Sequence, residues 1–112
     1  MGFERVCAAD DVGAGEMMAF FLGGWEVLVV RDGRGTLRAM DGICPHEDYP
    51  LVEGLFDGTV LTCANHLWSF DATTGKGINP PGCRLSQYAI KVEHGDVFVD
   101  TDAEPDTSGG TG

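Results

Sequence analysis

Apolar residues occur along this chain in short runs that glycine and other turn-forming residues interrupt. Two of these runs, Met17–Leu22 and Trp25–Val30, flank the pair Gly23-Gly24, and this arrangement predicts a β-hairpin. No window of the length of a helix sustains the three-to-four-residue spacing of an amphipathic helix. The pattern therefore predicts an all-β fold built from short antiparallel strands.

Other segments have the same character and complete the expected set of elements. We expect a single helical turn at Ala8–Val12, before the first hairpin, and a last hairpin that turns across His94-Gly95-Asp96. The expected strands are Phe3–Cys7, Met17–Leu22, Trp25–Val30, Thr36–Met40, Thr59–Thr62, Leu67–Phe70, Tyr88–Val92 and Val97–Val99.

The composition changes after Asp100. Residues 101–112 consist almost entirely of Asp, Glu, Thr, Ser, Gly and Pro, a composition typical of disorder. We therefore expect one domain over residues 1–100 and a disordered acidic tail over residues 101–112. A chain of 112 residues forms only a small core, which is marginal without an added cross-link.

The charge of the chain excludes several classes of partner. There are 7 Lys and Arg residues against 18 Asp and Glu residues, which gives a formal net charge of −11 at pH 7. Because basic residues do not cluster along the sequence, neither nucleic acid nor an anionic membrane surface is an expected partner. The longest apolar run is far too short to span a bilayer, and early acidic residues would interrupt a signal peptide. We expect a cytoplasmic protein, and a monomer.

Two short Cys/His motifs carry the candidate chemistry. Cys44-Pro45-His46 is followed, after sixteen residues, by Cys63-Ala64-Asn65-His66. Each motif follows a β-like segment, so the two loops can face one another at the ends of paired strands. A Cys₂His₂ set can hold structural zinc, although zinc fingers usually pair Cys with Cys and His with His. One thiolate and one imidazole in each loop instead favour a Rieske [2Fe–2S] centre, in which two His replace two Cys on one iron.

The two motifs lie within a longer set of matching residues. This set comprises Cys44-Pro45-His46-Glu47, Gly54, Thr62-Cys63, His66-Leu67-Trp68, Gly75 and Gly77-Ile78-Asn79-Pro80. In this set the chain resembles the Rieske ferredoxins, from Phe3 to about Val99. Within that family it is similar to the ferredoxin components of soluble diiron monooxygenases, the toluene 4-monooxygenase type and its alkene- and isoprene-oxidising relatives.

The resemblance implies a fold, a cofactor and ligands. The implied fold is an all-β Rieske iron–sulfur domain with a cluster-binding subdomain at about residues 43–81. The implied cofactor is one [2Fe–2S] cluster, with Cys44 and Cys63 on one iron and His46 and His66 on the other. The stretch from Gly77 to Gly82 matches the family's third loop, which shields the cluster from water.

The resemblance also implies a role. The chain would be no enzyme itself but the electron-carrier component of a multicomponent hydrocarbon monooxygenase. Its partners would be an NADH-dependent flavin/iron–sulfur reductase and a diiron hydroxylase. The alternatives are the ferredoxin of a Rieske aromatic-ring dioxygenase system, a nitrite-reductase-type small subunit and, outside this chemistry, a zinc-stabilised interaction module.

The surroundings of the motifs bear on the redox potential. High-potential members of the family carry an additional cysteine in each loop and nearby Ser and Tyr hydroxyls that bond the sulfurs. Here Tyr49 and Asn65 stand where those cysteines would fall, and Trp68 and Phe70 stand near the hydroxyl positions. The sequence therefore predicts a potential toward the low end of the Rieske range, on the order of −150 mV.

The sequence also predicts positions for several residues outside the two motifs and for the acidic residues next to His46. Glu47 and Asp48 adjoin the first histidine, and we expect them to form an acidic rim at which a partner docks. Cys7 and Cys83 have no nearby Cys or His at ligand spacing and are expected to be buried apolar residues or free thiols. Trp25 is expected in the core. His94 is expected in a surface turn.

Overall fold

The computed structural model describes residues 3–22, 24–44, 50–64, 68–79 and 84–101. Within these residues the elements are strands and two short 3₁₀ turns, which confirms the expected all-β class. None of the described segments forms a helix long and apolar enough to cross a membrane. In chain order the elements are β1 (Glu4–Ala8), η1 (Ala9–Asp11), β2 (Met17–Leu22), β3 (Trp25–Arg31), β4 (Leu37–Asp41), η2 (Leu51–Glu53), β5 (Leu55–Phe56), β6 (Val60–Thr62), β7 (Ser69–Asp71), β8 (Gly77–Asn79), β9 (Gln87–Glu93) and β10 (Asp96–Asp100).

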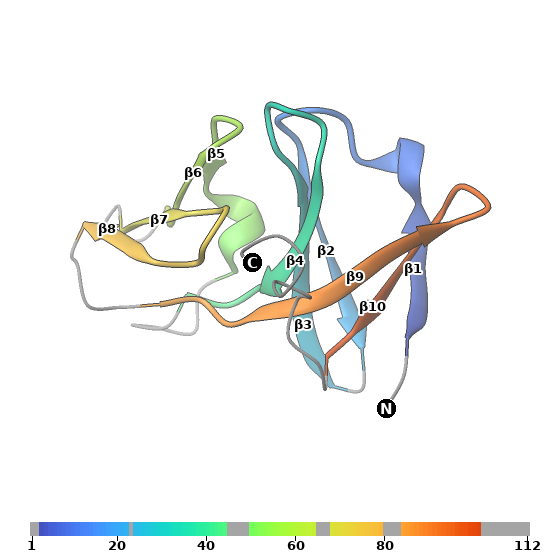
Figure 1. The fold of residues 1–112 in the computed structure, drawn as a ribbon. Helices are drawn as coiled ribbons and strands as arrows, with labels where there is room; N and C mark the ends of the chain where they lie inside the picture. The colour runs from blue at the N-terminus through green and yellow to red at the C-terminus, as the bar shows by residue number, and fades with distance from the viewer. Residues whose placement is uncertain (1–2, 23, 45–49, 65–67, 80–83, 102–112) are drawn as a thin grey trace, which may run out of the picture.

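The strands form two antiparallel sheets of different size (Figure 1). The large sheet has six strands in the order β1-β10-β9-β4-β3-β2, and the small sheet has four in the order β5-β6-β7-β8. In Figure 1 the small sheet lies to one side of the large one, and η2 lies between them. The small sheet comes from a single stretch of the chain, inserted between β4 and β9 of the large sheet.

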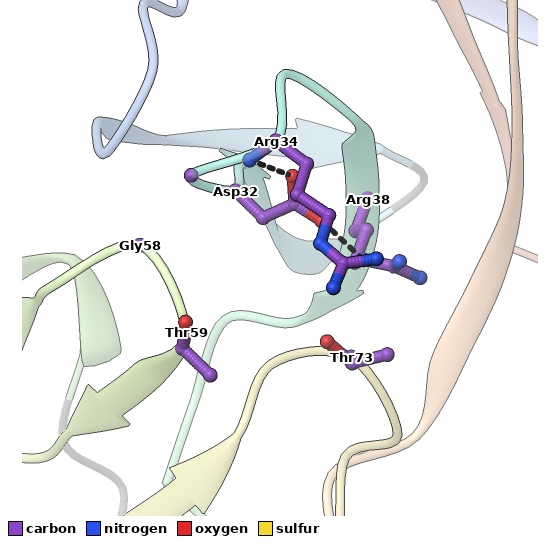
Figure 2. A pocket seen from close by; sticks show the side chains of 7 residues that line it. Asp32, Arg34, Arg38, Gly58, Thr59 and Thr73 are labelled. Atoms are coloured by element: carbon purple, nitrogen blue, oxygen red, sulfur yellow. Dashed lines mark hydrogen bonds and ion pairs between the residues drawn. The ribbon is translucent and has the colours of Figure 1, made fainter.

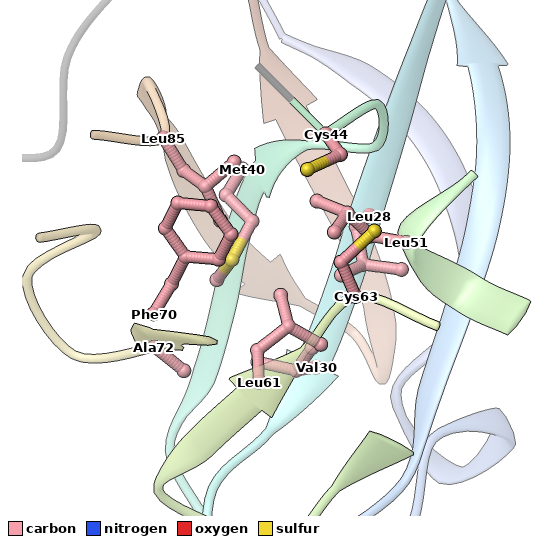
Figure 3. Close-up of a cluster of buried hydrophobic side chains, with 10 residues drawn as sticks. All are labelled: Leu28, Val30, Met40, Cys44, Leu51, Leu61, Cys63, Phe70, Ala72 and Leu85. Carbon is pink, nitrogen blue, oxygen red and sulfur yellow. The ribbon is translucent and has the colours of Figure 1, made fainter. Parts of the chain in front are cut away.

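Strand β3 is buried on both faces because its side chains alternate between two cores. Val27 and Val29 pack into a cluster formed by strands of the large sheet together with Val12, the sheet core. Leu28 and Val30 point the other way, into the cluster between the two sheets, the inter-sheet core. The uninterrupted apolar run Val27–Val30 therefore belongs to a central strand, which is buried on both faces. The sheet core comprises Cys7, Val12, Leu22, Val27, Val29, Ala39, Val97 and Val99. The inter-sheet core comprises Leu28, Val30, Met40, Cys44, Leu51, Leu61, Cys63, Phe70, Ala72 and Leu85 (Figure 3).

Both predicted hairpins are confirmed by the strand register. Leu22 pairs with Trp25, so the first hairpin has a two-residue turn. In the last hairpin the turn consists of His94 and Gly95 alone, because Asp96 is already paired in β10. His94 and Gly95 have positive φ angles of 53° and 80°, as a two-residue turn between twisted antiparallel strands requires. His94 is exposed, as expected for a surface turn.

Other expectations need correction. Trp25 was expected in the core, but 62% of its surface is exposed. It is the first residue of β3, next to the hairpin turn. Its cross-strand partner Leu22 belongs to the sheet core, but Trp25 does not, and along β3 the sheet core begins at Val27. The sequence pattern also missed β5, β8 and η2, since elements of two or three residues have no measurable periodicity. The predicted helical turn is present as η1, and Cys7 is buried as expected.

Gly54 occupies a place where no larger residue fits. It follows η2 and lies against the end of β6, immediately before the second Cys/His motif. A Cβ atom on Gly54 would lie 2.0 Å from the carbonyl oxygen of Thr62 and 3.2 Å from the amide nitrogen of Ala64. Because both contacts are with backbone, neither can be relieved by rotating a side chain.

The substitution Gly54→Ala should therefore destabilise the protein by roughly 1–3 kcal/mol or more, the range typical of overpacking. The matched control is Gly33→Ala, where the nearest atom to an added Cβ lies 3.9 Å away. Chemical denaturation of both variants measures the free energies of unfolding. Equal losses in the two variants would contradict the close-packing argument.

Candidate metal centre

The structure brings together the two cysteines of the predicted ligand set. Cys44 follows β4 and Cys63 follows β6, so each begins a loop at the end of a strand, as the sequence predicted. Both are buried, with 2% and 0% of their surfaces exposed, and both belong to the inter-sheet core. Figure 3 shows the two sulfur atoms at the same end of that core, beside Leu28 and Leu51. His46 and His66 lie outside the described residues.

Backbone hydrogen bonds close the first loop at its base. The Leu51 N–H donates to the Gly42 carbonyl at 2.8 Å, and Ile43 forms an isolated bridge with Pro50. The Gly42 N–H in turn donates to the carbonyl of Glu26 in β3, at 2.9 Å. The loop that carries Cys44 is therefore anchored to a central strand of the large sheet.

The second loop is closed in the same way. The Cys63 N–H donates to the Trp68 carbonyl at 2.6 Å, across the base of the loop. Trp68 is half-buried and packs against the inter-sheet core. The predicted ligand Cys63 thus takes part in the hydrogen bond that closes its own loop.

A third loop has a comparable base. The Leu85 N–H donates to the Gly75 carbonyl at 2.8 Å, and Lys76 pairs with Arg84 in an isolated bridge. Gly75 has a φ angle of +80°, and a Cβ there would lie 2.4 Å from the Leu85 carbonyl oxygen. The residues between these anchors include the proline-containing stretch expected to shield the cluster. Positions 80–83 of that stretch lie outside the described residues.

The second and third loops leave the small sheet at one edge. Ser69, at the start of β7, pairs with Thr62, at the end of β6, and with Asn79, at the end of β8. The base of the Cys63 loop and the end of β8 are therefore neighbours. We call this side of the small sheet the loop edge.

A polar contact fixes the end of β4 just before the first loop. The Tyr88 hydroxyl donates to Oδ1 of Asp41, and the Ser86 N–H donates to Oδ2 of the same carboxylate at 3.2 Å. Burial raises the pKa of Tyr88, and its hydrogen bond to the Asp41 carboxylate raises it further. No sequence signal pointed to this contact, because Asp41 and Tyr88 are far apart in the chain.

The two buried cysteines fit either an iron–sulfur cluster or a zinc ion. Two thiolates in a core are costly unless a cation balances them, and soft thiolate ligands suit these metals. Cys7 provides the contrast, since it lies in the sheet core, where no second cysteine is present among the described residues. Burial raises the pKa of the Cys7 thiol, and the nearby carboxylates of Asp11 and Asp96 raise it further, which favours the neutral thiol. Cys7, Cys44 and Cys63 form no disulfide within the described part of the chain.

The described residues do not complete a metal site by themselves. Among them, no group of three or more His, Cys, Asp or Glu side chains could hold a metal ion. Two ligands of the predicted set are in place, and the two histidines needed to complete it are not described. The acidic pair Glu47 and Asp48, expected as a docking rim, also lies outside the described residues, as does Cys83.

Comparison with known proteins finds similarity along most of the chain. The family profile "Rieske [2Fe-2S] domain" matches residues 2–89. The ferredoxin component of the alkene monooxygenase system of Xanthobacter autotrophicus is 46% identical over 104 residues, which cover 92% of this chain and 84% of that protein. The ferredoxin component of biphenyl 2,3-dioxygenase from Rhodococcus jostii is 35% identical over 101 residues, which cover 89% of this chain and 94% of that protein.

Similarity extends to a solved structure. It is described as a complex of reduced oxygenase and oxidized ferredoxin in carbazole 1,9a-dioxygenase. One chain of that structure matches with a TM-score of 0.79 and 30% identity, covering 87% of this chain and 100% of the other. The likeness is therefore not confined to the two Cys/His motifs.

Replacing the two motif cysteines tests whether they bind iron or are only buried core residues. We expect Cys44→Ala and Cys63→Ala each to lose the bound iron, because each would remove one of the two thiolates expected to hold one iron. Cys7→Ala is the matched control, a buried cysteine in the other core, and it should keep its iron. Iron and sulfide analysis with the visible spectrum measures the outcome. Iron retained in Cys44→Ala, or lost equally in Cys7→Ala, would show that the ligand assignment is wrong.

Proposed function

This chain belongs to the Rieske [2Fe-2S] domain family, and on that premise we propose that it is the electron-transfer ferredoxin of a multicomponent hydrocarbon monooxygenase. Its cofactor is a Rieske-type [2Fe–2S] cluster. The observation that carries the proposal is the placement of two buried cysteines on two loops with closed bases, each cysteine followed in sequence by a histidine. An electron carrier needs such a centre and no substrate pocket beside it.

The proposed ligands divide the site into two sides. Cys44 and Cys63 would hold one iron from within the inter-sheet core, where water is excluded. His46 and His66, which follow the two cysteines in the same motifs, would hold the second iron. When bound, the cluster takes up and releases one electron at a time. Because two neutral imidazoles replace two thiolates, the site carries less negative charge than a four-Cys site, which raises its potential.

The partner on the accepting side is an oxygenase. The matching chain of the carbazole dioxygenase structure belongs to a complex of oxygenase and ferredoxin, and the relatives above are ferredoxin components of oxygenase systems. The finer assignment, a diiron hydroxylase reduced through an NADH-dependent flavin/iron–sulfur reductase, is supported by the 46% identity to the alkene monooxygenase ferredoxin.

A second candidate has weaker support. The chain could serve a Rieske aromatic-ring dioxygenase, as the 35% identity to the biphenyl dioxygenase ferredoxin indicates. The two candidates share cofactor and ligands and differ only in the oxygenase that accepts the electron. The partner therefore has to be identified by electron transfer itself.

Spectroscopy and a redox titration test the cofactor. The reduced protein should give an electron paramagnetic resonance signal with an average g value below the free-electron value, whereas zinc would give none. The midpoint potential should be on the order of −150 mV, because the additional loop cysteines and hydroxyls of high-potential members are absent from the motifs. His66→Ala should lose the visible spectrum. A strongly positive midpoint would contradict the reasoning about the potential.

Reconstitution with purified partners tests the role. Stopped-flow mixing of the reduced protein with a diiron hydroxylase, and separately with a Rieske dioxygenase, compares the rates of electron transfer. We expect faster transfer to the hydroxylase. The charge-reversed double variant Glu47→Lys/Asp48→Lys should slow transfer most at low salt, since exposed charges act mainly on association. Faster transfer to the dioxygenase would favour the second candidate. An unchanged rate in the variant would contradict the hypothesis that Glu47 and Asp48 form a docking surface.

A further inference from the structure

A cavity lies at the edge of the small sheet away from the loop edge. It has a volume of about 300 Å³ and is formed where the turn between β3 and β4 approaches two turns of the small sheet (Figure 2). The Gly33 N–H donates to the Gly58 carbonyl at 2.9 Å and joins the first pair of turns. The cavity is lined by Asp32, Gly33, Arg34, Arg38, Gly58, Thr59 and Thr73.

A buried carboxylate organises the basic side of the cavity. Asp32 is 6% exposed, and its Oδ1 accepts the N–H groups of Arg34 and Thr36, both at 2.9 Å. Its Oδ2 accepts Nε of Arg38 at 3.2 Å. Burial alone would raise the pKa of Asp32, but these hydrogen bonds and the Arg38 charge outweigh it and hold the pKa below its ordinary value. Asp32 is thus ionised and fixes the guanidinium group of Arg38.

The three arginines of this hairpin are used very differently. Arg31 donates to three carbonyl oxygens, those of Val12, Gly35 and Ala9, and is fully engaged in the fold. Arg38 uses only Nε in its contact with Asp32 within the described residues. Its terminal nitrogens bond to no other side chain or carbonyl of the described residues, so they can donate to a ligand.

Arg34 has no ion pair within the described part of the chain, and its side chain lines the same cavity as Arg38. In Figure 2 the guanidinium groups of Arg34 and Arg38 overlap in the view, above Thr73, and both residues line the cavity. Two like charges in one cavity, with a single carboxylate between them, leave a formal charge of +1. This local positive charge contrasts with the formal net charge of −11 of the whole chain.

We propose that this cavity binds a small anion of the phosphate class. Guanidinium groups present paired N–H donors that match phosphate oxygens, and two such groups supply more donors than one carboxylate ligand can accept. The hydroxyls of Thr59 and Thr73 add donors from the opposite wall. The acids of those turns, Asp57 and Asp71, accept N–H groups of their own turns and do not line the cavity.

Binding would connect the two sheets at a second place. Arg34 and Arg38 belong to the hairpin of the large sheet, whereas Thr59 and Thr73 belong to turns of the small sheet. An anion held by both sets would add a bridge beside the Gly33–Gly58 hydrogen bond. The proposed anion site does not rest on the electron-carrier role, so its failure would leave the proposed function untouched.

Isothermal titration calorimetry of the cluster-loaded protein with inorganic phosphate tests the proposal, at constant ionic strength maintained with sodium chloride. We expect saturable binding to one site. Arg34→Gln should weaken it by roughly tenfold or more, the effect of losing charge-assisted hydrogen bonds. Arg38→Lys should weaken it too, while it keeps a positive charge beside Asp32 so that the hairpin still folds. Arg5→Gln is the matched control, an exposed arginine that pairs with Asp96 on the large sheet, and it should bind as the unchanged protein does.

Titrations with other anions identify the class of ligand. Glycerol phosphate in place of inorganic phosphate shows whether the site accepts a phosphate monoester, and saturable binding of either supports the proposal. Acetate tests the carboxylate alternative, and acetate binding as tight as phosphate would overturn the assignment to phosphate. Heats that do not saturate, or that persist unchanged in Arg34→Gln, would overturn the site itself.

Discussion

The packing of the small sheet against β3 and β4 is the constraint on which the rest of this structure depends. The strands of the small sheet are only two or three residues long, and strands of that length cannot hold a sheet together by their own pairing. The inter-sheet core supplies what the pairing lacks, through Leu28, Val30 and Met40 on one side and Leu61 and Phe70 on the other. The same core surrounds Cys44 and Cys63, so the candidate ligands and the attachment of the small sheet share one set of contacts.

This shared core also explains why thiols, and not carboxylates, occupy the two positions. A buried carboxylate would carry its charge into the core whether or not a metal is bound. A thiol is neutral and apolar until a metal displaces its proton, so the core tolerates Cys44 and Cys63 in both states. Imidazoles belong on the outer side of such a site, where they add no charge and can lie close to a docked partner.

The features that could be predicted from the sequence are those set by local chemistry. Turn residues indicated two hairpins because two-residue turns need positive φ angles, which few residue types adopt. Gly24, His94 and Gly95 have such angles. The Cys/His motifs were recognisable for a similar reason, since ligand spacing is a local property. Elements defined by distant partners were not predictable: β5 and β8 exist only because β6 and β7 lie beside them.

The backbone bonds that close the three loops left no sequence signal either, because any residue type can make them. Trp25 shows the limit of an apolar pattern, which identifies a strand but not where the core beneath it stops. The arginine cavity was missed for the opposite reason. Its charged residues are few and lie far from Thr59 and Thr73 in sequence, and only the approach of separate turns brings them together.

The small sheet is therefore held at two opposite edges by different means. At the loop edge, the bond between the Cys63 N–H and the Trp68 carbonyl closes one cysteine loop, and a metal bound to both cysteine loops would cross-link them. At the other edge, the Gly33–Gly58 bond joins the turns that line the arginine cavity. Strand β6 runs between these edges, with Thr59 before its first residue and Cys63 after its last. Because so short a strand in a close-packed core moves as a unit, the position of Cys63 depends on how firmly the turn at Thr59 is held. The contacts at the far edge thus help to hold Cys63 in position, although they lie at the opposite end of β6.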